Sequence, residues 1–315
     1  MKNALLKKLE VNKLSEAEHF PRYFEIETYR GCNAKCKMCF MDKMADKNHQ
    51  MSEELYEKII NEAGSYSQSI EMFILARNGE PLLDSKLEQR IKLAKKHGMK
   101  LVSISTNASL LTEKRARAII ESGLDDIRFS IDGTTKESFE KIREGLKFKK
   151  VMENCLNFIK LRNQYGMKPI IQIRFVSQED NQGQEESFKE FWLNELSSQD
   201  IIAIRKMHNW GGTLDSYSEN KIKKYIPIPC KSLWNSMVIL VDGTVPLCAM
   251  DYNADVLLGN ANKSGLKEIW DSSQLKTLRY KHLHGKRNDI DMCKGCSVWE
   301  NGTKTEYQLS HSLPI

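Results

Sequence analysis

Six short runs of apolar, β-branched or aromatic residues, each followed by a segment with helical spacing, constrain the fold of this chain most strongly. The runs are YFEIETY (23–29), IEMFILA (70–76), KLVSIST (100–106), DIRFSID (126–132), PIIQIRFV (169–176) and DIIAIRKM (200–207). Strands that alternate with helices are typical of a parallel sheet with helices packed on its outside. We therefore predict an α/β fold, a partial (β/α)6 TIM-like barrel, with ligands at the carboxyl ends of the strands.

Helical spacing and capping residues fall between the predicted strands. Ser52, followed by two glutamates, indicates the start of the first helix. Two later helices close on Gly98 and Gly123, and glycine suits the left-handed conformation found just after a helix. The helices expected after the first one cover 84–97, 112–122, stretches within 135–165, and 184–196.

The strand–helix pattern changes near Pro227. The run SMVILVDGTVPLC (236–248) predicts a β-hairpin that turns at Asp242-Gly243, and a helix is expected over about 265–282. We predict a small C-terminal module made of this hairpin and helix. The predicted divisions are an N-terminal extension over 1–21, the barrel over 22–226 and the small module over 227–315.

Composition limits the kinds of partner. No apolar run of the 315-residue chain is long enough for a transmembrane helix, and the N-terminus lacks the apolar block of a signal peptide. We therefore expect a cytoplasmic protein with no membrane partner. The net charge of +6 is modest, and no basic, aromatic stripe indicates nucleic-acid binding. Without a secretion signal, the eight cysteines are expected to be metal ligands or catalytic thiols rather than disulfides.

Three of the cysteines lie in one loop directly after the first predicted strand. The stretch YRGCNAKCKMCF (29–40) contains Cys32, Cys36 and Cys39. Closely spaced thiolates select zinc or iron–sulfur clusters. Three thiolates can hold three corners of a four-iron cubane and leave one iron open to a substrate. The alternative is a zinc site completed by a distant ligand such as His19 or His49.

This CxxxCxxC loop resembles the signature of the radical S-adenosylmethionine (SAM) enzymes. The resemblance covers about residues 22–208 and implies a [4Fe–4S] cluster whose open iron is chelated by the methionyl amino and carboxylate groups of SAM. It also implies that an electron from the cluster cleaves SAM to a 5′-deoxyadenosyl radical, which takes a hydrogen atom from the substrate.

Further motifs at the ends of the predicted strands match the order found in this family. The resemblance implies that NGEP (78–81) holds the methionyl amino group, and that STNA (105–108) and SIDG (130–133) contact the ribose or carboxylate. Arg174 is expected to pair with the SAM carboxylate. Many members carry an aromatic residue just before the third cysteine, where this chain has Met38. The residues assigned to SAM are Met38, Phe40, Asn78, Gly79, Glu80, Pro81, Ser105, Asn107, Ser130, Asp132 and Arg174.

The predicted C-terminal module holds a second set of cysteines. Cys230, Cys248, Cys293 and Cys296 provide four thiolates, enough for a closed zinc or [4Fe–4S] site. Their layout resembles the SPASM/twitch extensions of radical SAM enzymes, which favours an auxiliary cluster over zinc. The full SPASM pattern has seven cysteines, so we expect one auxiliary cluster here. The layout is especially similar to that of single-auxiliary-cluster aminocyclitol or sugar dehydrogenases.

The resemblance implies an oxidoreductase. The expected reaction is dehydrogenation of a small sugar, cyclitol or similar alcohol, with the auxiliary cluster as electron acceptor and flavodoxin or ferredoxin as the first electron donor. The segment RKMHNWGG (205–212) leaves the last predicted strand at the expected mouth of the site. His208 is a candidate base because histidine titrates near neutral pH. Arg205 or Lys206 would ease proton loss, and Trp210 would wall the pocket.

Three alternatives remain open. The first is a peptide or protein maturase that forms thioethers or formylglycine. The few residues before the first strand and the lack of a second auxiliary cluster count against it. The chain would be a radical epimerase if Cys155 donates a hydrogen atom, but the spacing of Cys155 with Val151, Phe158 and Ile159 favours a buried structural thiol. The non-enzymatic alternative is a zinc-ribbon binding module.

Overall fold

The computed structural model describes residues 1–41, 44, 47–207, 229–294, 296 and 307–310 of the 315-residue chain. Its main element is an eight-stranded sheet in the order β11-β1-β5-β6-β7-β9-β10-β14. The first seven strands in this order are parallel to one another, and β14 is antiparallel to β10. The strands are β1 (Tyr23–Ile26), β5 (Met72–Ile74), β6 (Val102–Thr106), β7 (Asp126–Ser130), β9 (Ile170–Ser177), β10 (Ile201–Lys206), β11 (Ser236–Ile239) and β14 (Tyr307–Ser310).

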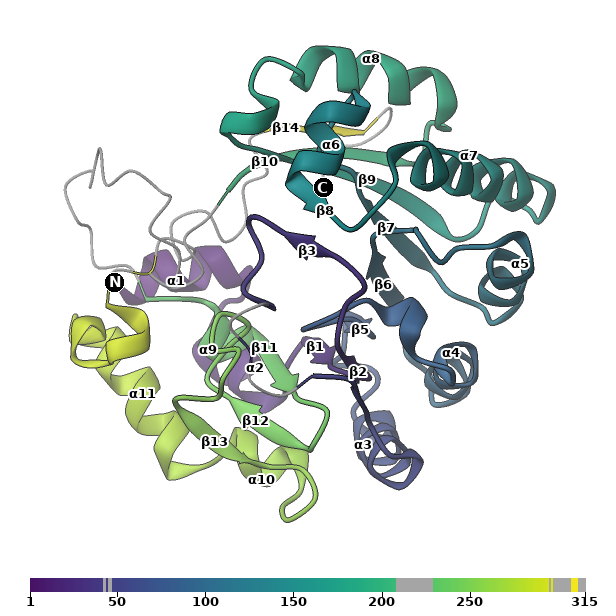
Figure 1. Ribbon diagram of the computed structural model, residues 1–315. Helices are drawn as coiled ribbons and strands as arrows, with labels where there is room; N and C mark the ends of the chain where they lie inside the picture. The colour runs from purple at the N-terminus through teal and green to yellow at the C-terminus, as the bar shows by residue number, and fades with distance from the viewer. Residues whose placement is uncertain (42–43, 45–46, 208–228, 295, 297–306, 311–315) are drawn as a thin grey trace.

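Helices cover the outer side of the curled sheet (Figure 1). They are α3 (Glu53–Ser65), α4 (Leu87–Lys96), α5 (Glu113–Glu121), α6 (Lys136–Ile142), α7 (Phe148–Gln164) and α8 (Glu185–Glu195). The Ser52 hydroxyl accepts a hydrogen bond from the Leu55 amide at 3.1 Å, as a cap of α3 should. Gly98 and Gly123 have positive φ after α4 and α5. The predicted α/β barrel is therefore confirmed, with all six predicted strands and one further parallel strand.

Short elements lie on the inner side of the sheet and between the main elements. β2 (Tyr29–Arg30) pairs with β4 (His49–Gln50), and β3 (Lys35–Cys36) pairs with β8 (Arg143–Glu144), both antiparallel. The 3-10 turns are Pro81–Leu83, Glu179–Asn181, Arg287–Asp289 and Asp291–Cys293. No helix in the described part of the chain has the length and hydrophobicity to cross a bilayer.

The predicted hairpin over 236–248 is wrong in its pairing. The chain does turn at Asp242-Gly243, where the Leu240 amide donates to the Thr244 carbonyl at 2.8 Å. However, β11 before the turn pairs with β1, and β12 (Thr244–Pro246) after it pairs with β13 (Leu257–Asn260). The reason is that Met237, Val238 and Ile239 are all buried, as in a parallel strand covered on both faces.

The helix predicted over 265–282 is two helices. These are α10 (Leu266–Trp270) and α11 (Ser273–Leu283), and the hydroxyl of Ser272 caps the second by accepting from the Leu275 amide. The expected boundary near residue 227 falls outside the described residues. Since β11 joins the main sheet, the C-terminal elements continue the barrel on its β1 side (Figure 1).

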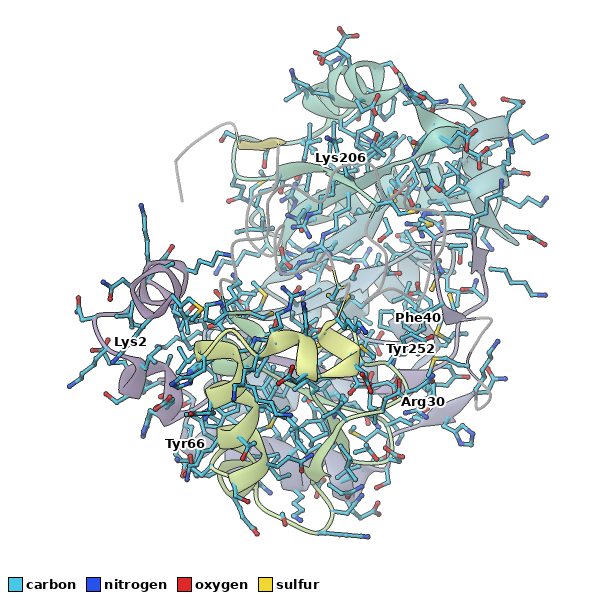
Figure 2. The ribbon with its side chains drawn as sticks, turned by 90° about the vertical axis from the view of Figure 1, so that its left-hand side faces the viewer. Lys2, Arg30, Phe40, Tyr66, Lys206 and Tyr252 are labelled. Atoms are coloured by element: carbon cyan, nitrogen blue, oxygen red, sulfur yellow. The ribbon has the colours of Figure 1, made fainter. Side chains whose placement is uncertain are left out.

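The N-terminal residues pack against the C-terminal elements. The helices α1 (Lys2–Leu9) and α2 (Leu14–His19) bury Leu5, Leu9 and Ala17. The indoles of Trp234 and Trp270 donate to the side chain and the carbonyl of Glu18, at 3.2 and 3.0 Å. The purple N-terminal helices accordingly lie beside the yellow-green C-terminal ones in Figures 1 and 2. The predicted N-terminal extension is thus integrated into the fold.

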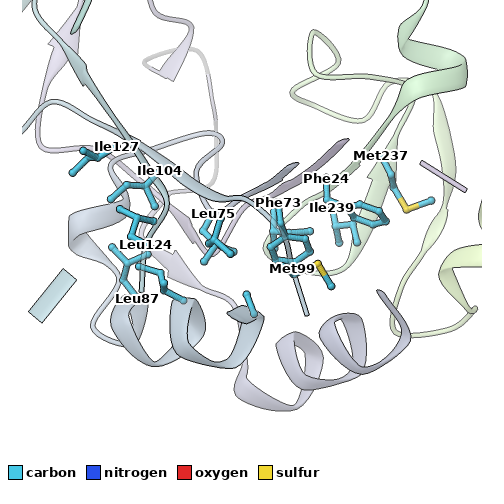
Figure 3. Close-up of a cluster of buried hydrophobic side chains, with 14 of the residues drawn as sticks. Phe24, Phe73, Leu75, Leu87, Met99, Ile104, Leu124, Ile127, Met237 and Ile239 are labelled. Carbon is cyan, nitrogen blue, oxygen red and sulfur yellow. The ribbon is translucent and has the colours of Figure 1, made fainter. Parts of the chain in front are cut away.

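The hydrophobic core lies between the sheet and its outer helices (Figure 3). Phe73, Ile104 and Ile127 point from β5, β6 and β7 into this layer and are fully buried. Strand side chains alternate between faces, so the residues between these point to the inside of the curl. That inner face is polar, as shown by the hydrogen bond from the Ser103 hydroxyl to Asp126. The polar lining leaves the interior suited to a hydrophilic ligand.

Candidate cluster and cofactor sites

The three cysteines of the first loop lie together at the end of β1 and β2. Cys32, Cys36 and Cys39 are half-buried, and the Cys39 amide donates to the Cys36 carbonyl at 2.9 Å. Burial and the carboxylate of Glu80 raise the pKa of the Cys32 thiol to about 12, and the two neighbouring thiols contribute to this rise. Thiols that oppose one another's ionisation become thiolates when positive metal ions are added. The donor set therefore fits a bound iron–sulfur cluster.

Arg143, which the sequence analysis missed, lies beside this loop. The pairing of β3 with β8 sets Arg143 opposite Cys36, and its Nη1 donates to the Cys36 sulfur at 3.6 Å. Its Nη2 forms an ion pair of 2.6 Å with Asp132 Oδ2. Asp132 Oδ1 accepts from the Val176 amide at 2.7 Å. The buried Asp132, predicted to contact SAM, thus holds Arg143 against the cysteine loop.

Gly79 joins the NGEP motif to the cysteine loop. Gly79 and Gly31 form a parallel β-bridge, the Gly31 amide donates to the Asn78 carbonyl at 3.2 Å, and the Glu80 amide donates to the Gly31 carbonyl at 2.8 Å. A Cβ atom on Gly79 would lie 2.8 Å from the Gly31 nitrogen and closer still to the Gly31 oxygen. Glycine at this position therefore allows the backbone of NGEP to approach that of Gly31, and the predicted contact of Gly79 with SAM stays a prediction.

Asn78 has buried polar atoms available to a ligand. The residue is 1% exposed, and within the described structure neither its side-chain oxygen nor its side-chain nitrogen has a hydrogen-bond partner. Burying an amide without partners costs about 1–3 kcal/mol per group. A polar ligand beside the cysteine loop would remove this cost, so Asn78 fits the predicted contact with SAM. Pro81, next to Glu80, is buried at the start of its 3-10 turn.

Glu80 links NGEP to the end of β6. Its carboxylate accepts from the Thr106 hydroxyl at 2.5 Å, the Asn107 amide at 2.8 Å and the Leu82 amide at 3.1 Å. Burial raises the pKa of Glu80, and these three hydrogen bonds oppose the rise. The predicted contact of Glu80 with the amino group of SAM stays a prediction. What the contacts establish is that Glu80 fixes the STNA segment.

Asn107 turns from this segment toward the cysteines. Its Nδ2 donates to Asn33 Oδ1 at 3.0 Å and lies 3.9 Å from the Cys32 sulfur, while its Oδ1 accepts from the Ser109 amide at 2.9 Å. Ser105 and Ser130 are half-buried on the inner face of β6 and β7. Their predicted contacts with SAM stay predictions.

Phe40 packs against the C-terminal part of the chain. Its ring stacks on Tyr252 with centroids 4.0 Å apart and an angle of 18° between the planes (Figure 2). Phe40 is only 2% exposed, within a small cluster with Met41 and Met44. Stacking of Phe40 on the adenine ring of SAM would require one face of the Phe40 ring to be uncovered. The predicted contact of Phe40 with SAM stays a prediction. Met38 is half-buried, and its predicted contact with SAM stays a prediction.

The predicted catalytic residues are only partly within the described structure. Arg205 and Lys206 lie exposed at the carboxyl end of β10. His208 and Trp210 lie outside the described residues. Arg174 is half-buried on β9, and its Nε donates to Gln172 Oε1 at 2.7 Å.

The four C-terminal cysteines are brought together from separate elements. Cys230 precedes α9 (Ser232–Asn235), Cys248 follows β12, and Cys293 ends a 3-10 turn three residues before Cys296. Burial raises the pKa of Cys293 to about 12, and the thiols of Cys230 and Cys296 contribute to this rise. Burial also raises the pKa of Cys248, and the charges of the other three thiols add to it. A set of four thiols that interact in this way fits a closed cluster site.

Backbone contacts hold this second set in place. The Met250 amide donates to the Cys248 sulfur at 3.4 Å. Arg287 Nη2 donates to the carbonyls of Cys293 and Cys296 at 2.9 and 2.8 Å. Hydrogen bonds and cations near thiolate ligands stabilise the negative charge of an iron–sulfur site.

A single zinc ion and a four-iron cluster require different separations between their thiolates. Among the described residues, no group of three or more His, Cys, Asp or Glu side chains has the geometry of a metal-ion site. One tetrahedral zinc ion would bring its thiolates to within about 3.8 Å of each other. In a four-iron cluster each thiolate binds a different iron, so the sulfurs lie further apart.

Comparison with known families agrees with this geometry. Residues 26–170 match the radical SAM superfamily, and residues 230–297 match SPASM, an iron–sulfur cluster-binding domain. This chain is a radical SAM protein with a SPASM domain. Its cofactors are therefore SAM, the [4Fe–4S] cluster to which SAM binds, and auxiliary iron–sulfur binding in the SPASM domain.

Two curated relatives illustrate the range of this family. The chain is 28% identical over 178 residues to the tungsten-containing aldehyde ferredoxin oxidoreductase cofactor-modifying protein of Pyrococcus furiosus, covering 55% of this chain but only 48% of that protein. It is 22% identical over 288 residues to the SAM-dependent 2-deoxy-scyllo-inosamine dehydrogenase of Niallia circulans, covering 90% of this chain and 95% of that one.

Solved structures share the fold at low sequence identity. The structure of BtrN in complex with AdoMet and 2-DOIA has a TM-score of 0.59 and 20% identity, covering 88% of this chain and 93% of that one. The structure of Streptococcus suis SuiB bound to the precursor peptide SuiA has a TM-score of 0.68 and 13% identity, covering 88% of this chain and 70% of that one. These similarities establish the barrel with its C-terminal extension.

Proposed function

We propose that this radical SAM enzyme is a dehydrogenase that oxidises a hydroxyl group of a small molecule such as a sugar or cyclitol. The observation that carries the proposal is the gathering of Cys230, Cys248, Cys293 and Cys296 at one site. Four protein ligands close a [4Fe–4S] cluster, which then suits electron transfer rather than substrate binding. The alignment over 95% of the inosamine dehydrogenase supports the same reaction class.

The residues of this chain would hold the reacting groups as follows. Cys32, Cys36 and Cys39 would bind three irons of the first cluster, and Asn78 would offer its buried amide to SAM. Arg143 and Asn107 lie beside the cysteine loop and would position it. When bound, the cofactors supply a radical that removes hydrogen from the substrate carbon and a cluster that accepts the remaining electron.

Loss of the hydroxyl proton completes the oxidation to a ketone. We assign help in this step to Arg205 or Lys206, because both lie at the carboxyl end of β10. A nearby cation lowers the pKa of a hydroxyl group. His208 stays a proposal as the base and Trp210 as a wall of the pocket. A cytoplasmic flavodoxin or ferredoxin is the proposed electron donor.

The test uses the reconstituted, oxygen-free holoenzyme with SAM, a chemical reductant and a panel of sugars and cyclitols. We expect 5′-deoxyadenosine, methionine and a ketone in equal amounts with the true substrate, because each turnover cleaves one SAM and oxidises one hydroxyl group. Cys248→Ala should still cleave SAM but yield little ketone, because the electron acceptor is lost. Ketone formation at the wild-type rate in that variant would contradict the proposal.

The maturase alternative is supported by the similarity to the peptide-bound SuiB structure. A precursor peptide that is modified while no polyol is oxidised would favour it. The epimerase alternative has less support, because Cys155 is fully buried in α7 and burial raises the pKa of its thiol. It lies among outer-face residues such as Phe158, which packs on Phe129 of β7 with ring centroids 5.4 Å apart. Cys155→Ala should therefore leave product formation intact, whereas an epimerase would lose it.

A further inference from the structure

Arginines gather on the inner face of the curled sheet. Arg128, Arg174 and Arg205 occupy neighbouring strands β7, β9 and β10. Each arginine has a sequence neighbour that is buried against the outer helices. These neighbours are Phe129, Ile173 and Ile204. Because strand side chains alternate between faces, the three arginines share the opposite face.

The strand register fixes how the arginines follow one another. Arg174 is paired with Ser130, two residues beyond Arg128 on β7. Arg205 is paired with Val176, two residues beyond Arg174 on β9. The three side chains therefore rise in steps across the sheet toward the carboxyl ends of the strands, where ligands of such barrels bind.

The acidic groups nearby neutralise only part of this charge. Arg128 Nε pairs with Asp126 Oδ1 at 2.6 Å. Arg77, in the bend after β5, pairs through Nη1 with Glu25 Oε2 at 3.0 Å. Its Nε and Nη2 are buried and have no hydrogen-bond partner within the described structure.

Within the part of the chain that the structure describes, Arg174 and Arg205 have no carboxylate partner. The Nε of Arg174 donates to the neutral amide of Gln172, and no carboxylate among the described residues forms an ion pair with Arg174 or Arg205. Arg77 and Arg128 are each balanced by one carboxylate, Glu25 and Asp126. The four arginines therefore carry two more positive charges than these two carboxylates neutralise. Burial and the charges of Arg128 and Arg205 hold the pKa of Arg174 well below its usual value. A bound anion would relieve this repulsion.

Arg143, rather than Arg174, is placed to meet a ligand of the first cluster. Arg143 contacts the Cys36 sulfur, whereas Arg174 has its hydrogen bond within β9, to Gln172. The expected pairing of Arg174 with the SAM carboxylate stays a prediction, and this contrast points to a different anion as the partner of Arg174. Arg174 and Arg205 are therefore available to a second anion on the inner face of the sheet, near the carboxyl ends of the strands.

We propose that Arg174 and Arg205 bind a carboxylate or phosphate group on the substrate. The inference rests on the proposed function and narrows its substrate class to an acidic polyol, such as a sugar acid or sugar phosphate. It leaves help with proton loss to Lys206, the other residue proposed for that step. Guanidinium groups suit both anions because they offer two parallel N–H donors. The relative from Niallia circulans is named for an inosamine, an amine that would be a cation in this pocket. The substrate of this chain therefore differs in charge from that of the relative.

The test measures binding without turnover, using the reconstituted holoenzyme with SAM. The probes are inorganic phosphate, glucuronate, glucose and glucosamine, each titrated by calorimetry. We expect phosphate or glucuronate to bind and the neutral and amine-bearing sugars to bind at least tenfold more weakly. The stronger of the two anionic probes identifies the group. Binding of neither anion would overturn the proposal.

Variants locate the anion. Arg174→Gln and Arg205→Gln should each weaken binding of the anionic probe roughly 10- to 100-fold, the usual effect of losing a charged hydrogen bond. Arg117→Gln is the matched control, because Arg117 lies exposed on α5 and pairs with Glu113. Arg205 is exposed, so its variant should fold even if Arg174→Gln does not. Unchanged anion binding in Arg205→Gln would overturn the proposal.

SAM titration of the same variants separates the two anion sites. We expect the affinity for SAM to fall less than threefold in Arg174→Gln, as judged by the cluster spectrum. A loss of SAM affinity with unchanged anion binding would assign Arg174 to SAM and overturn the inference. Anion binding without oxidation of any acidic polyol would support the inference and count against the dehydrogenase. If neutral polyols are oxidised and Arg174→Gln does not change the rate, the result would support the dehydrogenase and overturn the inference.

Discussion

At the scale of single residues, the cysteine loop depends on contacts from distant parts of the sequence. Gly79 meets Gly31 backbone to backbone, Asn107 reaches the Cys32 sulfur, and Arg143 reaches the Cys36 sulfur. The loop is therefore held by three separate segments, which follow β5, follow β6 and form β8. A cluster held by only three protein ligands needs such support, since metal ligands work best when their surroundings fix them.

Replacing Gly79 with alanine should loosen this loop. The new Cβ would overlap the backbone of Gly31, and overpacking of this kind costs about 1–3 kcal/mol. We expect a lower melting temperature and loss of iron from the first cluster, measured by thermal unfolding and iron analysis. Gly166→Ala is the control, because Gly166 also has positive φ but has open space around it. Equal iron loss in both variants would show that the Gly31 contact is unimportant.

Replacing Arg143 with glutamine should leave Asp132 buried without its partner. Breaking a buried ion pair costs about 3–5 kcal/mol in unfolding free energy, measured by chemical denaturation. Asp132→Asn in the same chain should recover part of this loss, because the buried charge is removed. The exposed pair of Lys149 and Glu153 gives the comparison, and Lys149→Gln should cost less than about 1 kcal/mol. An Arg143→Gln effect as small as that of Lys149→Gln would contradict the role given to Arg143.

At the scale of elements, the barrel and the SPASM region share a sheet and a packed interface. Strand β11 pairs with β1 along four residues, from Tyr23 with Ser236 to Ile26 with Ile239. Tyr252 covers Phe40, which directly follows the third cysteine of the loop. Changes in the packing of the C-terminal region should therefore alter the position of the loop that holds the first cluster.

Tyr252→Ala should weaken this coupling. Loss of a stacked aromatic pair costs about 0.5–1.5 kcal/mol beyond the buried area, and the cavity adds to it. We expect the first cluster to lose iron faster on exposure to a chelator, followed by its absorbance. Tyr252→Phe keeps the ring and should behave like the wild type. If Tyr252→Ala also retains its iron, the stacking on Phe40 does not support the loop.

At the scale of the whole molecule, the sequence predicts the architecture but not the long-range contacts. Six apolar runs each became a parallel strand, since the pattern of each run reports its own burial. The hairpin failed because the sequence shows that 236–241 is apolar but not which strand it will pair with. Arg143 lies 107 residues from Cys36, so no local pattern connects them. The sequence shows one arginine in each of the runs DIRFS, IQIRF and IAIRK. Only the register of the paired strands shows that these arginines lie near one another.

The central claim is that the chain binds two clusters and that only the one at Cys32, Cys36 and Cys39 has an iron open to SAM. The most direct test is electron paramagnetic resonance of reduced, oxygen-free protein with and without SAM, in two variants. One replaces Cys32, Cys36 and Cys39 with alanine, and the other replaces Cys230, Cys248, Cys293 and Cys296. Each should keep about four of about eight irons. SAM should change the signal of the second variant and leave that of the first unaltered. A SAM response in the first variant, or none in the second, would contradict the claim.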